Sequence, residues 1–253
     1  MPSGGPAVVS GPSTARSDRP RAVVSWSSGK DAAMALHEVR RAGDVEVVGL
    51  LTTVTRDYDR ISMHGVRRAV LDLQARAAGL PLTVVEIPAA CPNEVYERSM
   101  ASALAALRRD GVERVVFGDL FLEEIRAYRV EHLRGTGIAP MFPLWGRPTD
   151  RLAREMIRLG IRAHVVCVDP RRLGAQFAGR SFDETFLRDL PAGVDPCGEN
   201  GEFHTCVVAG PFFRGGPLSL EVGPVVERDG FVFADLRPPG GAGRRPPPTG
   251  GGG

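Results

Sequence analysis

The sequence predicts an α/β fold, with a doubly wound parallel sheet between helices and a smaller α+β domain after it. Short apolar runs alternate with helical patterns along most of the chain. These runs are too continuously apolar for a sheet with one face in water, so we expect a parallel sheet that is buried on both faces. Right-handed crossovers then make the sheet doubly wound, and ligands bind beyond the carboxyl ends of its strands.

The expected elements follow one another in regular order. The first strand covers residues 22–26, and the helix after it has its apolar residues at i, i+3, i+4 and i+7, namely Ala32, Ala35, Leu36 and Val39. The same reasoning places further strands at 45–53, 82–87, 114–118 and 139–145. Further helices are expected at 66–77, 93–109 and 123–134.

The pattern continues for one more unit after Gly146. A helix is expected to start near Thr149 and Asp150, which can cap its N-terminus, and a strand is expected at 163–168. Beyond Pro170 the sequence becomes irregular. We therefore predict two domains, 21–146 and 147–236. The Pro-, Ser- and Gly-rich segments 1–20 and 237–253 are expected to be disordered.

Composition excludes several classes of protein. The chain has 253 residues, a net charge of +2 and no long basic run, which disfavours a nucleic-acid partner. No run approaches the roughly 20 apolar residues that span a bilayer. The N-terminal residues show no apolar h-region, so we do not expect secretion. Four scattered cysteines form no disulfide framework. The sequence thus predicts a cytoplasmic protein with no membrane partner, and it is compatible with a homodimer.

Lys30 is the only lysine in the sequence, whereas arginine supplies the other cations. An ammonium group is a compact point charge, while guanidinium is a wide planar fork. A single retained lysine therefore indicates a position that a guanidinium cannot serve.

Lys30 lies in a loop that has the character of an anion site. Free N–H groups and the helix dipole at a helix N-terminus both favour negative charge. Small residues allow close approach of a phosphate, and Asp31 could hold Mg²⁺. The loop joins the first strand to the first helix, and its residues are Ser25, Trp26, Ser27, Ser28, Gly29, Lys30 and Asp31.

This loop is not a Walker A motif, because Val24 stands at the first glycine position and Asp31 at the Ser/Thr position. No GxGxxG follows the strand either, which argues against NAD or FAD. The run instead resembles the SGGKDS signature of PP-loop ATP pyrophosphatases. Ser28 replaces a glycine there, which tightens the steric fit because glycine accepts φ > 0 more easily than serine. Ala32 replaces the last serine and removes one hydroxyl donor.

Further motifs extend this resemblance. In order, they are Phe117-Gly118-Asp119, Arg129-Val130-Glu131, Pro143-Leu144-Trp145-Gly146 and Gly198-Glu199-Asn200-Gly201-Glu202-Phe203-His204-Thr205. Together they resemble the diphthine–ammonia ligase family over about residues 22–211. None of these motifs would be specific alone, but their combination is.

The resemblance implies a HUP-type Rossmann-like, PP-loop ATP-binding domain over 21–146 and a substrate-binding domain over 147–236. It also implies an ATP-dependent amide ligase that uses ATP and Mg²⁺. A carboxylate-bearing substrate would attack the α-phosphorus of ATP, pyrophosphate would leave, and ammonia would displace AMP.

The resemblance assigns roles to particular residues. Catalysis is expected from Lys30, Asp31 and Asp119, with Asp31 as a metal ligand. Besides the loop, nucleotide contacts are expected from Thr52, Thr53, His64, Gly118 and Arg129. The substrate would contact Glu131, Glu199, Asn200, Gly201, Glu202, His204 and Thr205.

Other interpretations remain open from the sequence alone. The two replacements in the loop favour a non-catalytic ATP- or AMP-sensing protein. A PP-loop RNA-modifying enzyme would need a cysteine pair such as Cys91 and Cys197. A zinc site built from His204, Cys197 and Cys206 is a weaker interpretation, since the spacing fits no common pattern. His132 is expected on the surface, and Arg129 either pairs with a nearby glutamate or holds a phosphate.

Overall fold

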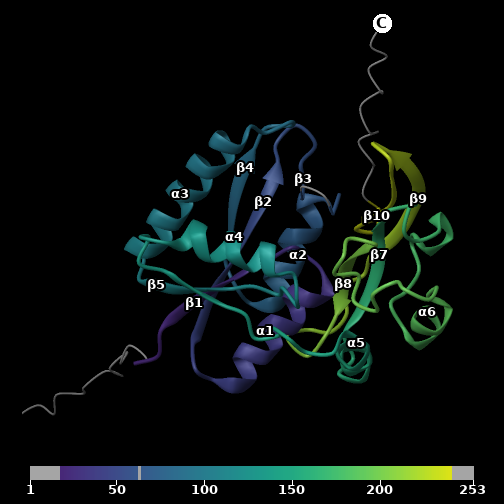
Figure 1. Ribbon diagram of the computed structural model, residues 1–253, viewed down its shortest axis with the longest axis horizontal. Coiled ribbons are helices and arrows are strands. Elements are labelled where there is room, and N and C mark those ends of the chain that lie inside the picture. The colour runs from purple at the N-terminus through teal and green to yellow at the C-terminus, as the bar shows by residue number, and fades with distance from the viewer. Residues whose placement is uncertain (1–17, 62–63, 241–253) are drawn as a thin grey trace, which may run out of the picture.

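The structure is a computed structural model that describes residues 18–61 and 64–240. Its first sheet has the strand order β3-β2-β1-β5-β6, with β4 paired to β2 (Figure 1). All pairs in this sheet are parallel except β2–β3. The strands are β1 (Arg21–Ser25), β2 (Glu46–Thr55), β3 (Arg60–Ile61), β4 (Leu82–Ile87), β5 (Val112–Val116) and β6 (Ala139–Met141).

Helices cover both faces of this sheet, as alternating side chains in its strands require. In β1, Ala22 and Val24 pack into one hydrophobic cluster with α1 and α2, whereas Val23 packs into a second cluster with α3 and α4. The helices are α1 (Lys30–Ala42), α2 (Arg68–Ala78), α3 (Asn93–Arg109) and α4 (Glu123–Leu133). This arrangement confirms the predicted Rossmann-like α/β class.

The order of the strands reverses at β1. From β1 the chain continues to β2 and β4 on one side, and it then returns to place β5 and β6 on the other side. The carboxyl end of β1 is therefore the switch point at which doubly wound sheets bind ligands. The loop that contains Lys30 follows β1 directly.

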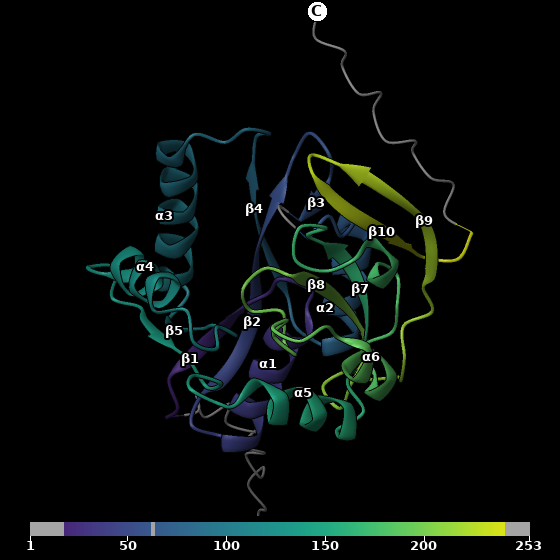
Figure 2. The same cartoon turned by 45° about the vertical axis from the view of Figure 1, so that its right-hand side comes forward.

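A second, antiparallel sheet has the order β8-β7-β10-β9 and lies beside α1 and α2 in both views (Figures 1 and 2). Its core is continuous with that of the first sheet: Phe203 and Val207 belong to the same cluster as Met34 and Leu36. The elements are α5 (Thr149–Arg158), β7 (Arg162–Val168), the 3-10 helix η1 (Ala175–Phe177), α6 (Glu184–Asp189), β8 (Phe203–Ala209), β9 (Glu221–Arg228) and β10 (Phe231–Arg237).

Three expectations for the elements need correction. The strand expected at 139–145 ends at Met141, since a turn closed by the Trp145 N–H and the Phe142 carbonyl follows it. The strand expected at 163–168 joins the second sheet rather than extending the first. Neither Thr149 nor Asp150 caps α5: Pro148 is the N-cap residue, and no side chain caps it.

The β9–β10 hairpin was not predicted, although its turn carries a recognisable signal. Asp229 and Gly230 have φ of 53° and 77°, the geometry that an Asp-Gly hairpin turn needs. The expected tail at 237–253 starts too early, because Arg237 is the last residue of β10. The expected disorder of residues 1–17 and 241–253 lies outside the described residues. Within the described part of the chain, no helix is long and apolar enough to cross a membrane.

Candidate functional site

The loop after β1 is held by the second sheet. Gly29 is the N-cap residue of α1, and the Lys30 N–H donates to Thr205 Oγ1 on β8 at 3.1 Å. The Val207 N–H donates to the Ser28 carbonyl at 2.9 Å. Ser28 is fully buried with φ of 71°, so the position has the left-handed conformation that favours glycine. Hydrogen bonds from β8 therefore hold the strained loop in its conformation.

Lys30 is the most deeply buried charged residue among those described, with 1% exposure. Its Nζ lies 2.9 Å from Asp31 Oδ2 and donates to the Cys197 carbonyl. The rings of Phe182 and Phe203 lie 5.4 Å and 5.3 Å from Nζ. Burial alone would lower the pKa of Lys30, but the nearby Asp31 carboxylate holds it above its usual value. Two of the three ammonium donors are thus engaged.

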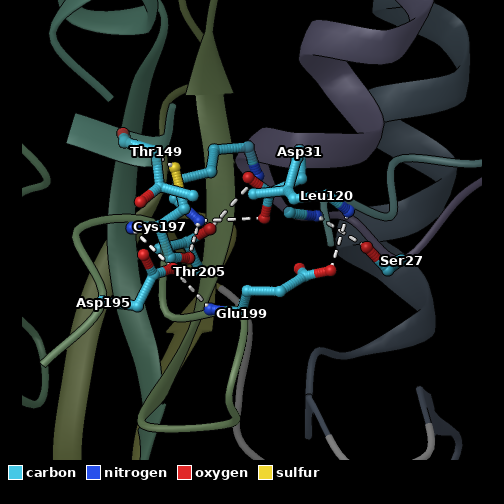
Figure 3. Close-up of polar contacts among 10 residues, drawn as sticks. Ser27, Asp31, Leu120, Thr149, Asp195, Cys197, Glu199 and Thr205 are labelled. Atoms are coloured by element: carbon cyan, nitrogen blue, oxygen red, sulfur yellow. Dashed lines mark hydrogen bonds and ion pairs between the residues drawn. The ribbon is translucent and has the colours of Figure 1, made fainter. Parts of the chain in front are cut away.

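Three carboxyl groups, those of Asp31, Asp119 and Glu199, line the same cavity as Lys30. Figure 3 shows two of them, Asp31 and Glu199. Glu199 Oε1 accepts the Leu120 N–H at 2.7 Å, and Asp119 Oδ2 lies 3.6 Å from Arg129 Nε. Burial, followed by the negative charges of Asp31 and Asp119, raises the pKa of Glu199 to about 7. Burial also raises the pKa of Asp31 and of Asp119, against the attraction of Lys30 and Arg129 respectively. This cluster therefore attracts cations and holds protons more tightly than free carboxyls do.

Asp31 Oδ1 and Asp119 Oδ2 are buried and accept no hydrogen bond from any described residue. Oxygen atoms of this kind suit Mg²⁺, which usually takes one or two carboxylates and completes its shell with water and phosphate. Among the described residues, no group of three or more His, Cys, Asp or Glu side chains could hold a metal without other ligands. These two carboxylates therefore fit a metal that a bound ligand also coordinates.

A cavity of about 450 Å³, here called the apolar cavity, lies at the carboxyl ends of β1, β2, β4 and β5. Its lining is mostly apolar, and its charged or titratable groups are Arg129, Glu97, His64, His132, Tyr96 and Tyr128. His132, expected on the surface, packs against Tyr128 with the two rings tilted by 36°, and its Nε2 lies 3.6 Å from Glu97 Oε1. Of the predicted residues, this cavity is lined by Ser25, Trp26, Ser27, Thr52, Thr53, His64 and Arg129.

A second cavity of about 480 Å³, here called the polar cavity, lies between the loop and the 197–205 segment of the second sheet. Ser25, Ser27, His64, Phe117 and Arg129 line both cavities, so the two adjoin. The other predicted residues that line the polar cavity are Gly29, Lys30, Asp31, Gly118, Asp119, Glu199, Asn200, Gly201, His204 and Thr205.

His64 and His204 form a stacked pair at this junction, with ring centroids 4.3 Å apart. Burial, followed by the charges of His204 and Lys30, lowers the pKa of His64 well below its usual value. Burial and Lys30 lower the pKa of His204 to about 4. Both rings are therefore neutral at pH 7. His64 Nδ1 is buried and has no hydrogen-bond partner among the described residues.

Three predicted site residues, Ser28, Glu202 and Glu131, line neither cavity. Trp26 lines the apolar cavity, but its indole is buried in the core and donates to Gln74 Oε1 at 2.9 Å. Glu202 Oε1 instead accepts the Asp195 N–H at 3.0 Å. Glu131 is exposed and pairs with Arg134 at 2.8 Å. The sequence pattern could not show which residues of a motif line a cavity and which point elsewhere.

Several cavity residues were missed by the sequence analysis. Tyr96 and Met100 show helical spacing that also fits an ordinary core, and both line the apolar cavity. Arg172 and Phe231 line the polar cavity, and no local signal marks either of them. Arg129 pairs with Asp119, neither with Glu123 nor with Glu131.

Comparison with known protein families gives a match for each of the two parts of the chain. Residues 20–138 match the diphthamide synthase N-terminal domain, and residues 148–223 match the diphthamide synthase C-terminal domain. The chain is 26% identical over 174 residues to the diphthine–ammonia ligase of Homo sapiens. It is 27% identical over 176 residues to that of Rattus norvegicus. Each match covers 62% of this chain and 65% of the relative's length. The chain belongs to the diphthamide synthase family.

Proposed function

We propose that this chain is an AMP-forming, ATP-dependent amide ligase. A carboxylate oxygen of the substrate attacks the α-phosphorus of ATP, and the bond to the bridging oxygen breaks with loss of pyrophosphate. Ammonia then attacks the acyl carbon of the adenylate, loses a proton and expels AMP. The printed names of the relatives, diphthine–ammonia ligase, support this reaction class.

One observation carries the proposal: the apolar and polar cavities adjoin at the carboxyl end of β1. A nucleoside in the apolar cavity would direct its phosphates past Ser27 and Arg129 into the polar cavity. There the triphosphate meets Lys30 and the N-terminus of α1, which favour negative charge. Thr52 and Thr53 of β2 line the apolar cavity and would contact the ribose or base.

In the first step, Lys30 and Arg129 would stabilise the negative charge that develops on the departing pyrophosphate. The third ammonium donor of Lys30 is available for a phosphate oxygen, and the ion pair with Asp31 keeps the side chain in place. Asp31 and Asp119 would hold Mg²⁺ through the oxygens that accept no hydrogen bond. When bound, the metal neutralises charge on the phosphates.

Glu199 is placed to serve the second step. Its carboxyl group lines the polar cavity, and its pKa of about 7 lets it exchange a proton near neutral pH. We assign it the proton that ammonia loses on attack. Asn200, Gly201 and His204 line the same cavity and would contact the substrate.

A second candidate is a protein that binds ATP or AMP without turnover. The strained Ser28 and the engagement of the Lys30 N–H by Thr205 favour it, because both limit the anion-binding capacity of the loop. An RNA-modifying enzyme has less support. The Cys197 thiol lies buried against the Thr149 carbonyl, and burial raises its pKa, whereas a catalytic cysteine needs the thiolate.

The test is incubation of the protein with ATP, Mg²⁺, ammonium and a panel of carboxylates. Release of AMP and pyrophosphate that depends on a carboxylate is the expected result, and ATP binding without AMP formation would favour the sensor. Lys30→Ala should abolish AMP formation. Because Lys30 is buried, Arg129→Gln provides a second variant with lower risk to folding, and it should weaken ATP binding. Unchanged turnover in both folded variants would overturn the assignment of the site.

A further inference from the structure

The β9–β10 hairpin contributes to the site, although the family match ends at residue 223. Phe231, the first residue of β10, lines the polar cavity. Further along β10, Phe233 and Asp235 contact the part of the first domain that includes β3 and His64. This strand therefore packs against Gly65, the residue that follows His64, and the His64 side chain lines both cavities.

Asp235 makes four hydrogen bonds to two arginines of the first domain. Its Oδ1 and Oδ2 accept from Arg67 Nε at 3.0 Å each, and Oδ2 also accepts from Arg67 Nη2 at 2.6 Å. Oδ1 also accepts from Arg60 Nη1 at 2.9 Å. The three side chains are between 17% and 22% exposed. Two-point pairing of this kind fixes orientation as well as distance.

The two arginines flank His64 along the chain and hold the main chain on its C-terminal side. Arg60 and Arg67 form an antiparallel bridge with each other. Arg60 Nη1 also donates to the Gly65 carbonyl at 2.6 Å. Gly65 has φ of 68°, and a Cβ at this position would lie 2.9 Å from the Phe233 ring. The residue after His64 is therefore pressed against β10 and bonded to an arginine that Asp235 holds.

The His64 side chain faces the cavities. It stacks on His204 of β8 and lines both cavities at their junction. A shift of its main chain would separate the stacked rings and change the passage between the apolar and polar cavities. Asp235 lies outside both cavities, so any influence on a ligand must pass through the residues that it holds.

We propose that Asp235 is a positioning residue: by holding Arg60 and Arg67 it fixes His64 against His204 and so shapes the junction of the two cavities. The effect of Asp235 on ATP binding rests on the proposed function. Its effect on the position of His64 against His204 does not. The inference concerns this chain's own hairpin, most of which lies beyond the family match.

The main test compares Asp235→Asn with Asp189→Asn in the full-length protein. The control removes the charge from another ion pair, Arg180–Asp189 at 2.7 Å, which lies in the second domain. Imidazole resonances of the five histidines are assigned by single substitutions and recorded without ligand. We expect Asp235→Asn to shift the resonances of both His64 and His204, because their mutual ring currents change. Asp189→Asn should leave them in place. Unchanged resonances in Asp235→Asn overturn the proposal.

Binding of a non-hydrolysable ATP analogue supplies the second measurement. Asp235→Asn should raise its Kd by about fivefold or more, as expected when a coupled contact is lost. In the His64→Ala background the same change should have no further effect, because Asp235 acts through His64. Additive effects overturn the proposal. If the wild-type protein binds no nucleotide, the proposed function fails, yet the imidazole spectra still decide the role of Asp235. Should Asp235→Asn not fold, Arg67→Lys keeps the charge, removes the two-point pairing and must give the same shifts.

Discussion

Thr205 Oγ1 lies 3.1 Å from the main-chain nitrogen of Lys30 and accepts its hydrogen bond. The two residues are 175 positions apart in the sequence. The second sheet thereby satisfies the first N–H group of α1, one of the groups that a helix N-terminus leaves open. The proposed anion binding by the loop would therefore depend on how the second domain is docked, since β8 holds both Ser28 and Lys30.

Replacement of Thr205 by valine should lower the free energy of unfolding by about 1 kcal/mol, the usual effect of a lost N-terminal cap. Valine keeps the shape of the side chain but removes the acceptor of the Lys30 N–H. Thr205→Ser is the control, because it keeps the hydroxyl group. Urea unfolding measures the free energy of unfolding of both variants. Equal destabilisation by Thr205→Val and Thr205→Ser would show that the hydroxyl group does not contribute to stability.

Ser28→Gly should stabilise the protein by up to about 1 kcal/mol. The residue has φ of 71°, where a side chain costs roughly 1–2 kcal/mol, and glycine removes that strain at a smaller entropic cost. Ser27→Gly should be destabilising instead, since Ser27 has no positive φ and its Oγ accepts the Gly29 N–H at 3.4 Å. Thermal unfolding should therefore show changes of opposite sign, and two changes of the same sign contradict the strain argument.

Gly65→Ala should destabilise the protein by more than Gly146→Ala. Both glycines have positive φ, of 68° and 73°, so both substitutions introduce backbone strain. Only at Gly65 does the new Cβ also meet a neighbour, the Phe233 ring at 2.9 Å, whereas nothing lies within 4 Å of it at Gly146. We expect a difference of about 1–3 kcal/mol from overpacking. Phe233→Leu should restore part of the stability that Gly65→Ala removes. If Gly65→Ala and Gly146→Ala destabilise the protein equally, the Phe233 ring moves aside at little cost.

Glu199→Gln should change how stability depends on pH. The folded-state pKa of about 7 lies above the usual 4.5, so the folded protein binds the proton more tightly than the unfolded chain does. The resulting stabilisation is complete below about pH 4.5, and it is lost as the pH rises through about 7. The glutamine variant keeps an acceptor for the Leu120 N–H and has no such dependence.

Stability curves of both proteins from pH 4 to 8 measure this difference. The variant should gain stability relative to the wild-type protein as the pH rises across this interval. A difference that stays constant with pH would mean that the Glu199 carboxyl titrates normally. Asp31 and Asp119 are present in both proteins, so their titration largely cancels in the comparison.

The sequence by itself determined the local parts of the protein. Apolar periodicity predicted β1, α1 and the strands around them, because burial on two faces leaves a direct pattern. The place of the loop after β1 and the single lysine were also visible, and Ser28 indeed lies where glycine is favoured. The Asp229-Gly230 turn was equally local and could have predicted the last hairpin.

Only the tertiary structure decided how distant segments complete the site. It placed the Cys197 carbonyl and Thr205 on Lys30, and it brought Glu199 to the Leu120 N–H. It also directed Glu131 into solvent and Glu202 into its own loop, although both belong to the same motifs as cavity residues. The physical reason is that periodicity and turn chemistry act over a few residues. Docking of the second sheet depends instead on a core shared by both domains, which no short segment encodes.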